Sequence, residues 1–227
     1  LKERINLKRF PAHIIKLDLD LLKEFTGSLP YSLTDAQRRS IWEIAQDISK
    51  SSPMNRLLEG DVGSGKTVVA AAACLLTVKS GLNAAFMAPT EILARQHYET
   101  LHKVLAPFKI KIGLLTSSEK KVPTGTEIFV GTHALIQKNT NLKNLGLVIV
   151  DEQHRFGVEQ RAALLRQATS NKRQVKNINS GSMSHVTCHM SHFLSMSATP
   201  IPRTLALAIY GDLDVSLLDE MPKARKA

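Results

Sequence analysis

Residues 60–67 read G-D-V-G-S-G-K-T, and this spacing of glycines, a lysine and a hydroxyl suits the binding of a nucleoside triphosphate. Glycine lets the backbone turn tightly and point its N–H groups at phosphate oxygens, and a helix that follows adds its positive end. Lys66 would neutralise the β and γ phosphates, and the hydroxyl of Thr67 would ligate Mg²⁺, which prefers oxygen ligands. The candidate nucleotide-binding residues of this loop are Gly60, Asp61, Val62, Gly63, Ser64, Gly65, Lys66 and Thr67.

An apolar run that ends in two carboxylates forms a second candidate, because residues 145–154 read L-G-L-V-I-V-D-E-Q-H. Asp151 is placed to hold Mg²⁺ through water, and Glu152 to orient or deprotonate an attacking water. Ligands of parallel sheets bind at the carboxyl ends of strands, so we expect both carboxylates beside the phosphate loop. The alternative is a solvated acidic turn. Together the two patterns favour hydrolysis, with Lys66, Asp151 and Glu152 as catalytic residues.

The hydrophobic pattern predicts the elements that position these residues. Short apolar runs alternate with helical patterns, which is typical of an α/β fold with a mostly parallel sheet and helices on both faces. Helices are expected at 34–48, 67–78 and 90–105, with Thr34 or Asp35 as the cap of the first. The expected strands cover residues 56–59, 84–88, 111–115, 127–130, 147–150 and 193–196.

Composition narrows the class of protein. Thirty Lys and Arg against twenty Asp and Glu give a formal charge of +10, which favours a polyanionic partner such as nucleic acid without establishing one. Two cysteines are too few for a disulfide framework, so we expect a cytoplasmic protein, with Cys74 as a small core residue. The chain has no apolar stretch of membrane-spanning length and no signal-peptide core at its charged N-terminus, so we expect no membrane partner.

Several motifs, taken in their order along the chain, resemble those of superfamily 2 helicases. They are A-P-T at 88–90, V-G-T-H-A-L at 130–135, D-E-Q-H at 151–154 and S-A-T at 197–199. A closer resemblance is to the bacterial RecG family of branched-DNA translocases, over about residues 29–222. It rests on the phosphate loop, D-E-Q-H-R-F-G-V at 151–158, A-T-P-I-P-R-T-L-A at 198–206 and Y-G-D-L-D at 210–214.

The transcription-repair coupling factors are the alternative family. They share R-F-G-V and T-P-I-P-R-T, but they typically have E-E-H where this chain has Glu152, Gln153 and His154. Gln153 therefore favours the RecG family. An RNA helicase is disfavoured, because residues 153–158 do not resemble the usual continuation of a D-E-A-D motif.

The resemblance implies a RecA-like P-loop domain that uses ATP and Mg²⁺, with Thr67 and Asp151 at the metal. It implies that Gln37 reads the adenine edge, although a surface glutamine on a helix is the alternative. Residues that touch a DNA backbone would be Pro89, Thr90, Arg95, Gly131, Thr132 and His133, with loop and cap chemistry as their alternative. Residues that couple nucleotide state to DNA would be His154, Ser197, Ala198 and Thr199, although His154 is also explained as a packing residue.

Two segments depart from the family pattern. The connection at 116–126 is short, which predicts that one helix is missing and puts the folding of that edge in doubt. Residues 169–192 are longer than the usual link and dense in Ser, Asn, Thr and His, which predicts a flexible polar insert. This insert contains His185, Cys188, His189 and His192, but their spacing does not favour a zinc site, because structural zinc sites usually use several thiolates.

The expected domain organisation is a linker or the end of an upstream domain at 1–30, an ATP-binding lobe at 31–222 and an exit at 223–227. The family uses a second RecA-like lobe, which supplies arginines to the hydrolytic site, and a DNA-binding wedge domain. We expect both to be missing from this chain, leaving Arg155 and Arg203 as the arginines near the motifs. The parent protein would then remodel replication forks and Holliday junctions, and the lobe alone would not unwind DNA. The alternative is a nucleotide-binding module without catalysis.

Overall fold

The computed structural model describes residues 11–136, 142–152, 189–199 and 213–221. The expectations for His154, Arg155 and Arg203, and for most of the polar insert, lie outside these residues. The described strands form one sheet of eight, in the order β4-β3-β5-β2-β6-β7-β1-β8, and every pair is parallel except β3 with β4. The strands are β1 (Asn55–Gly60), β2 (Asn83–Met87), β3 (Ile112–Leu115), β4 (Lys120–Lys121), β5 (Ile128–Gly131), β6 (Leu145–Asp151), β7 (His192–Ser197) and β8 (Asp214–Leu218).

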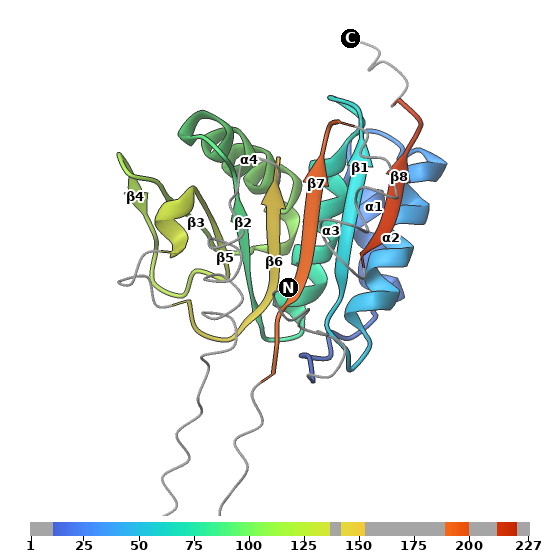
Figure 1. The fold of residues 1–227 in the computed structure, drawn as a ribbon, viewed down its shortest axis with the longest axis horizontal. Coiled ribbons are helices and arrows are strands. Elements are labelled where there is room, and N and C mark those ends of the chain that lie inside the picture. Colours follow the sequence, from blue (N-terminus) through green and yellow to red (C-terminus); the bar gives the residue numbers. More distant parts are fainter. Residues whose placement is uncertain (1–10, 137–141, 153–188, 200–212, 222–227) are drawn as a thin grey trace, which may run out of the picture.

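The α-helices of the described part lie behind the sheet in Figure 1 and pack on one of its faces. Side chains cap three of them: Asp18 caps α1, Thr34 caps α2 in a capping box with Gln37, and Thr90 caps α4. Thr34 was one of the two expected caps. These helices are α1 (Leu19–Ser28), α2 (Asp35–Ile48), α3 (Lys66–Lys79) and α4 (Glu91–Val104), and two 3₁₀ segments are η2 (Ala106–Phe108) and η3 (His133–Ile136).

Alternating side chains of each inner strand point to opposite faces, as strand geometry requires. On the helical face, Phe86 and Ile149 pack with α3, which is apolar on all sides and buried from Val68 to Val78. On the other face, Met87 and Val150 pack with a second cluster that includes η3. A helical layer was expected on both faces; the described residues supply one, and the second face has buried side chains as well.

The N-terminal segment belongs to the same core. Ile15 and Phe25 are fully buried and pack in the cluster that holds α2 and α3. Within the expected linker or upstream domain end at 1–30, the described residues 11–30 therefore pack on the core of this domain. No helix in the described part of the chain is long and apolar enough to span a membrane.

The sheet edge at residues 116–126 is folded without a helix. All of these residues are described, and β4 pairs antiparallel with β3 through Leu114 with Lys121 and Leu115 with Lys120. The missing helix is therefore confirmed, while the doubt about this edge was wrong. A turn brings the chain straight back onto β3, so the edge needs no helical crossover.

The opposite edge carries the strand β8, which the sequence analysis did not predict. It is short and pairs parallel with β1, from Arg56 with Asp214 to Gly60 with Leu218.

The end of the predicted polar insert is not a flexible polar segment, because His192 is fully buried and begins β7. Its ring accepts the Met54 N–H at Nδ1 and lies 2.6 Å from the His13 carbonyl at Nε2.

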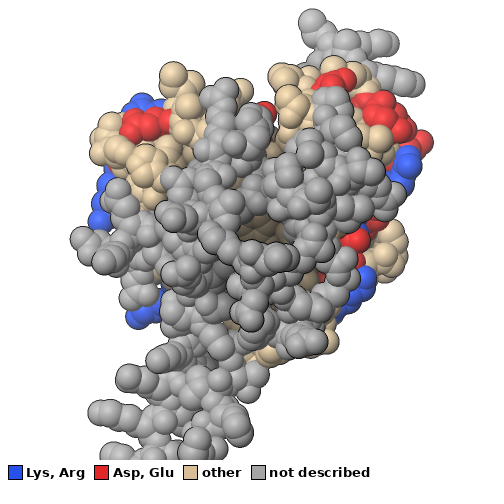
Figure 2. All heavy atoms as spheres, viewed as in Figure 1, with Lys and Arg blue, Asp and Glu red and all other residues tan. Residues whose placement is uncertain are grey.

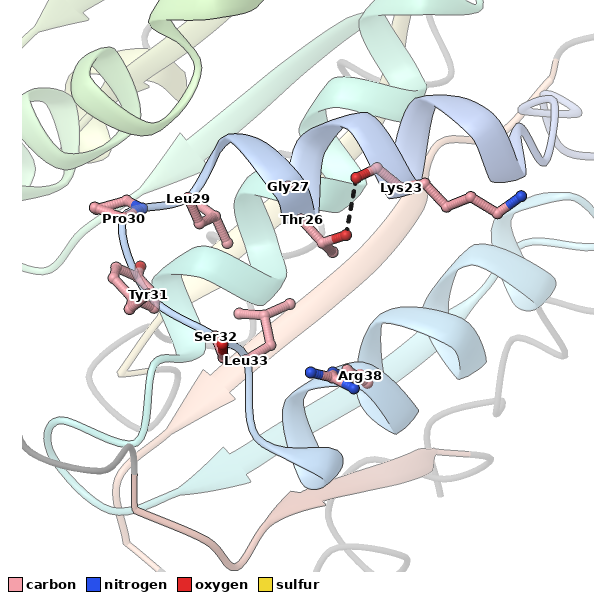
Figure 3. Close-up of a pocket in the computed structure, with 9 residues that line it drawn as sticks. All are labelled: Lys23, Thr26, Gly27, Leu29, Pro30, Tyr31, Ser32, Leu33 and Arg38. Carbon is pink, nitrogen blue, oxygen red and sulfur yellow. Dashed lines mark hydrogen bonds between the residues drawn. The ribbon is translucent and has the colours of Figure 1, made fainter.

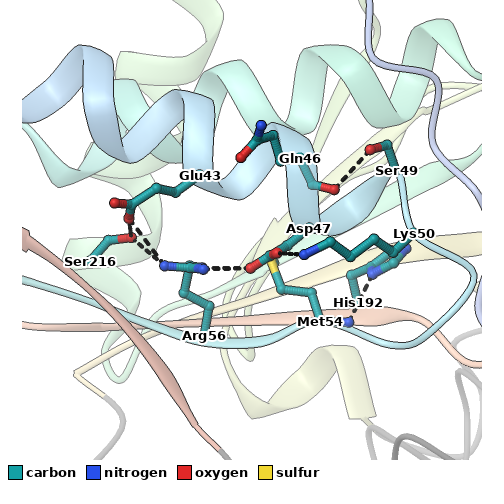
Figure 4. A network of polar contacts seen from close by, with 9 residues as sticks. All are labelled: Glu43, Gln46, Asp47, Ser49, Lys50, Met54, Arg56, His192 and Ser216. Atoms are coloured by element: carbon teal, nitrogen blue, oxygen red, sulfur yellow. Dashed lines mark hydrogen bonds and ion pairs between the residues drawn. The ribbon is translucent and has the colours of Figure 1, made fainter.

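A buried polar network ties α2 to β1 and β8 (Figure 4). Arg56 of β1 donates to Asp47 and Glu43 of α2 and to Ser216 of β8. Burial alone would raise the pKa of Asp47, but hydrogen bonds from Lys50 and Arg56 hold that pKa below its ordinary value. The network fixes the start of β1, and thus the strand that leads into the phosphate loop.

Candidate functional site

The phosphate loop has the backbone that its glycines predict. Gly63 and Gly65 have φ values of 86° and 90°, which only glycine adopts readily. A Cβ on Gly65 would lie 2.2 Å from Gln37 Nε2, so no larger residue fits there without rearrangement. The loop leads into α3, whose N-terminus has no side-chain cap, unlike α1, α2 and α4. Its first N–H groups are therefore available to an anion.

Lys66 lies against the loop that it belongs to. Its Nζ donates to the carbonyl oxygens of Gly60 at 2.6 Å and Asp61 at 2.9 Å. Burial lowers the pKa of Lys66, and the carboxylates of Asp151, Glu152 and Asp61 partly offset that shift. The ammonium group is thus near the two carboxylates that the sequence predicted for the site, and it joins two carbonyl groups of the loop.

Two oxygen groups make this place chemically suited to Mg²⁺. The Thr67 hydroxyl lies in the first turn of α3, and the Asp151 carboxylate ends β6. Hydroxyl and carboxylate oxygens are the ligands that Mg²⁺ takes, usually together with waters and phosphate oxygens. The residues present therefore fit Mg²⁺ bound with a nucleotide.

His97 of α4 was missed by the sequence analysis, and it joins the two expected metal ligands. Its Nε2 lies 2.7 Å from Asp151 Oδ2, and its Nδ1 lies 3.5 Å from Thr67 Oγ1. The ring is buried and packs on Phe86 with a centroid distance of 4.6 Å. A histidine between polar residues in an amphipathic helix gives no signal in one sequence, because its partners are 30 and 54 residues away.

Glu152 follows Asp151 in a left-handed backbone conformation, with a φ of 51°. This region is unfavourable for a residue with a side chain, and such residues are concentrated at functional sites. The Glu152 N–H donates to Asp151 Oδ1 at 3.0 Å. The turn therefore fixes Oδ1 of Asp151, while Oδ2 of the same carboxylate faces His97.

Gln37 contacts the phosphate loop directly. Its Nε2 donates to the Ser64 carbonyl at 2.7 Å, and its Oε1 accepts the Thr34 N–H at 3.0 Å. The side chain is buried, so the alternative of a surface glutamine is wrong. In this structure Gln37 links the cap of α2 to the loop, and its expected contact with adenine stays a prediction.

A pocket of about 690 Å³ opens beside α2, and one of its lining residues is Arg38, which follows Gln37 in the sequence (Figure 3). Its wall combines an aromatic ring, Tyr31, with two cationic side chains, Lys23 and Arg38. The remaining lining residues are Thr26, Gly27, Leu29, Pro30, Ser32 and Leu33.

The expected coupling residues lie at the end of β7, between the strands that carry the loop and the carboxylates. Ser197 is paired with Glu59 of β1, and its neighbour Met196 with Asp151 of β6. The Ser197 hydroxyl accepts the Thr199 N–H at 3.2 Å, which closes a tight turn around Ala198. The strand order thus brings this turn to the same edge as Gly60 and Asp151.

The expected DNA-contacting residues lie on the neighbouring strands of the same edge. Met87 of β2 pairs with Gly131 of β5, so the segments that begin at Pro89 and Thr132 are adjacent. Their side chains have structural partners: Thr90 caps α4, and Arg95 pairs with Glu119 at 2.9 Å. Thr132 is buried, its backbone N–H donates to the Leu115 carbonyl, and its hydroxyl has no hydrogen-bond partner among the described residues. His133 opens η3.

Charge on the described part of one face is mixed. Figure 2 shows Lys and Arg side chains along the sides of this face, with Asp and Glu close to them.

Cys74 is fully buried, and burial raises the pKa of its thiol to about 12, which confirms the expected core residue. Among the described residues no group of three or more His, Cys, Asp or Glu side chains could hold a metal ion by itself.

Fold and site together define a RecA-like P-loop lobe, in which a nucleotide loop and an acidic strand end share one edge of a parallel sheet. The chain belongs to the DEAD/DEAH box helicase family, whose model matches residues 34–208. The expected resemblance to the RecG family is also confirmed, by individual relatives. The chain is 47% identical to the ATP-dependent DNA helicase RecG of Aquifex aeolicus and 49% identical to that of Thermotoga maritima.

These matches cover 100% and 93% of the chain but only 28% and 26% of the two relatives, so the chain spans little more than a quarter of their length. A structure of RecG bound to a three-way DNA junction is 42% identical, with a TM-score of 0.74, over 97% of this chain and 28% of that one. A structure of S. cerevisiae Dbp5 bound to RNA and ADP BeF3 is 19% identical, with a TM-score of 0.62, over 88% of this chain and 50% of that one. The latter likeness shows the shared fold.

Proposed function

We propose that this chain is the ATP-binding motor lobe of a bacterial DNA helicase or translocase that remodels branched DNA in recombination and repair. The observation that carries the proposal is the meeting of Lys66, Thr67 and Asp151 at an uncapped helix N-terminus. The relatives are ATP-dependent DNA helicases, and one related structure holds a three-way junction, which supports ATP and branched DNA as the ligands. The cytoplasm is the proposed compartment, supported by the cysteine content.

Each residue of the proposed site has a separate role in phosphoryl transfer. Lys66 exchanges the carbonyls of Gly60 and Asp61 for phosphate oxygens, while the N–H groups at the start of α3 hold the same phosphates. Thr67 and Asp151 would hold Mg²⁺, and a bound Mg²⁺ would supply positive charge beside the β and γ phosphates. Glu152 orients the attacking water in line with the bond that breaks.

The base of the nucleotide is proposed to occupy the pocket lined by Tyr31, Lys23 and Arg38. An aromatic ring offers a stacking surface, and an arginine plane offers a second one. Gln37 precedes Arg38, which lines this pocket, and its side chain donates to the Ser64 carbonyl of the phosphate loop.

Replacement of Lys66 by alanine tests the proposal. We expect Lys66→Ala to weaken binding of a fluorescent ATP analogue by about a hundredfold or more, because charge-assisted hydrogen bonds to phosphate are lost. The fold should persist by circular dichroism, since no core volume is removed. Lys79→Ala, at the other end of α3, is the matched control and should bind as the unaltered chain does. Equal affinity of Lys66→Ala and Lys79→Ala would contradict the assignment of the phosphate loop.

A further inference from the structure

His97 is the feature of this site that the proposed mechanism does not use. It is 8% exposed, and both of its ring nitrogens face side chains that are expected to hold Mg²⁺. It lies in the middle of α4, a helix that carries none of the nucleotide motifs. The inference below rests on the proposed binding of a Mg²⁺ nucleotide at this site.

The hydrogen bonds define what each ring nitrogen does. A carboxylate oxygen can only accept, so the nitrogen 2.7 Å from Asp151 Oδ2 is the one that carries the proton. With one proton on the ring, Nδ1 is an acceptor, and it faces the Thr67 hydroxyl at 3.5 Å. When the Thr67 hydroxyl donates its hydrogen toward Nδ1, the lone pairs of its oxygen point away from the ring. A cation ligand needs this orientation, because the cation binds at the lone pairs.

The Asp151 carboxylate is held from both sides. Its Oδ2 faces His97, and its Oδ1 accepts the Glu152 N–H at 3.0 Å. Residues that hydrogen-bond to metal ligands in this way orient them and commonly change metal affinity by about 10- to 100-fold. The ring itself is fixed by Phe86, against which it packs at 4.6 Å between centroids.

We propose that His97 is a positioning residue, which holds the Thr67 hydroxyl and the Asp151 carboxylate in the arrangement that binds Mg²⁺ with a nucleotide. It also joins this arrangement to α4, because the helix begins at Glu91, directly after its cap Thr90. Thr90 is one of the residues proposed to meet DNA. Seven residues, or about 10 Å of helix, separate that cap from His97, so a rigid helix connects the two places.

Three substitutions separate the two contacts of the ring. Gln at position 97 is long enough to place an amide N–H near Nε2 and so keeps the contact with Asp151. Asn is shorter, keeps a polar group near Thr67 only, and loses Asp151. Leu keeps apolar volume against Phe86 and loses both. His102→Gln, on the exposed side of the same helix, is the matched control.

The measurement is the gain in affinity for a fluorescent ATP analogue when Mg²⁺ replaces EDTA, taken as the ratio of the two dissociation constants. We expect His102→Gln to keep this ratio within about twofold and His97→Leu to lower it by about tenfold or more, while His97→Gln and His97→Asn, which each lose one of the two contacts, fall between them. Affinity in EDTA should stay unchanged in all four variants, since the loop and Lys66 are intact. Electron paramagnetic resonance of Mn²⁺ bound with the nucleotide should report the same order of metal affinities.

The outcomes separate this inference from the proposed function. If the unaltered chain gains nothing from Mg²⁺, the proposed metal site fails. If it gains and His97→Leu gains equally, His97 is a packing residue and the inference is overturned. If His97→Gln loses as much as His97→Leu, the contact with Asp151 is not what positions the metal, and the inference is overturned as well.

Discussion

At the scale of single residues, His192 is a histidine that the fold keeps uncharged. Burial lowers the pKa of its ring to about 4, and the hydrogen bond to the His13 carbonyl, the nearby His13 ring and Asp47 are smaller influences. Its Nδ1 accepts the Met54 N–H, so a second ring proton would face a donor. Burial, followed by the nearby His189, also lowers the pKa of His13.

This predicts a loss of stability in mild acid. A histidine whose folded pKa lies below its unfolded value of about 6.5 stabilises the fold fully above that value. The contribution falls as the pH drops from about 6.5 to about 4, by on the order of 3 kcal/mol. Urea unfolding at several pH values would measure it. His192→Asn should be less stable at pH 7 and should lose less between pH 6.5 and 4 than the unaltered chain. Equal losses would show that other groups cause the acid effect.

At the scale of elements, the packing of α2 on the sheet depends on a charged residue inside the protein. Arg56 and Asp47 have side chains that are 10% and 12% exposed, and they join β1 to α2. Removing one partner of a buried pair leaves the other charge poorly compensated, and without Arg56 the Asp47 carboxylate would keep only the largely exposed Lys50.

We therefore expect Arg56→Ala to lower the free energy of unfolding by about 3–5 kcal/mol. Lys23→Ala is the comparison, because Lys23 forms an exposed pair with Asp20 at 3.1 Å and such pairs contribute less than about 1 kcal/mol. Chemical denaturation of both variants would decide. A similar small loss in both would mean that Lys50 and water, and not Arg56, balance the charge of Asp47.

At the scale of the whole molecule, the proposed motor lobe would supply one side of a catalytic site. Phosphoryl transfer relies on positioning and on stabilisation of charge, and an arginine from a facing domain contributes about 10³- to 10⁵-fold in related P-loop enzymes. Among the described arginines, Arg56 is held by Asp47 and Arg95 by Glu119.

The 227-residue chain alone is therefore expected to bind Mg²⁺ and ATP but to hydrolyse ATP hardly above background, and not to unwind DNA. A phosphate-release assay with and without forked DNA measures this. DNA-stimulated turnover of about one per second or faster, a rate usual for complete enzymes, would contradict the single-lobe account. No turnover with full nucleotide binding would agree with it and also with a module that only binds nucleotide. Adding the second lobe in trans separates the two, since only an incomplete motor would gain turnover.

The sequence by itself determined the local features of this protein. The phosphate loop, the Asp151 and Glu152 pair, the three predicted helices and the six predicted strands could be predicted because each depends on neighbouring residue types and on their period. The cap at Thr34 followed from the same kind of short-range pattern.

Only the tertiary structure decided which distant residues meet. His97 reaches Asp151 across 54 positions, His192 reaches Met54 across 138, and Arg56 reaches Ser216 across 160. The short strand β8 follows the same rule, because five residues without a strong apolar pattern become a strand only when β1 offers its free edge. Such contacts have no signature in one sequence: a polar side chain looks alike on a surface and in a core, and the order of the strands determines which of the two it is.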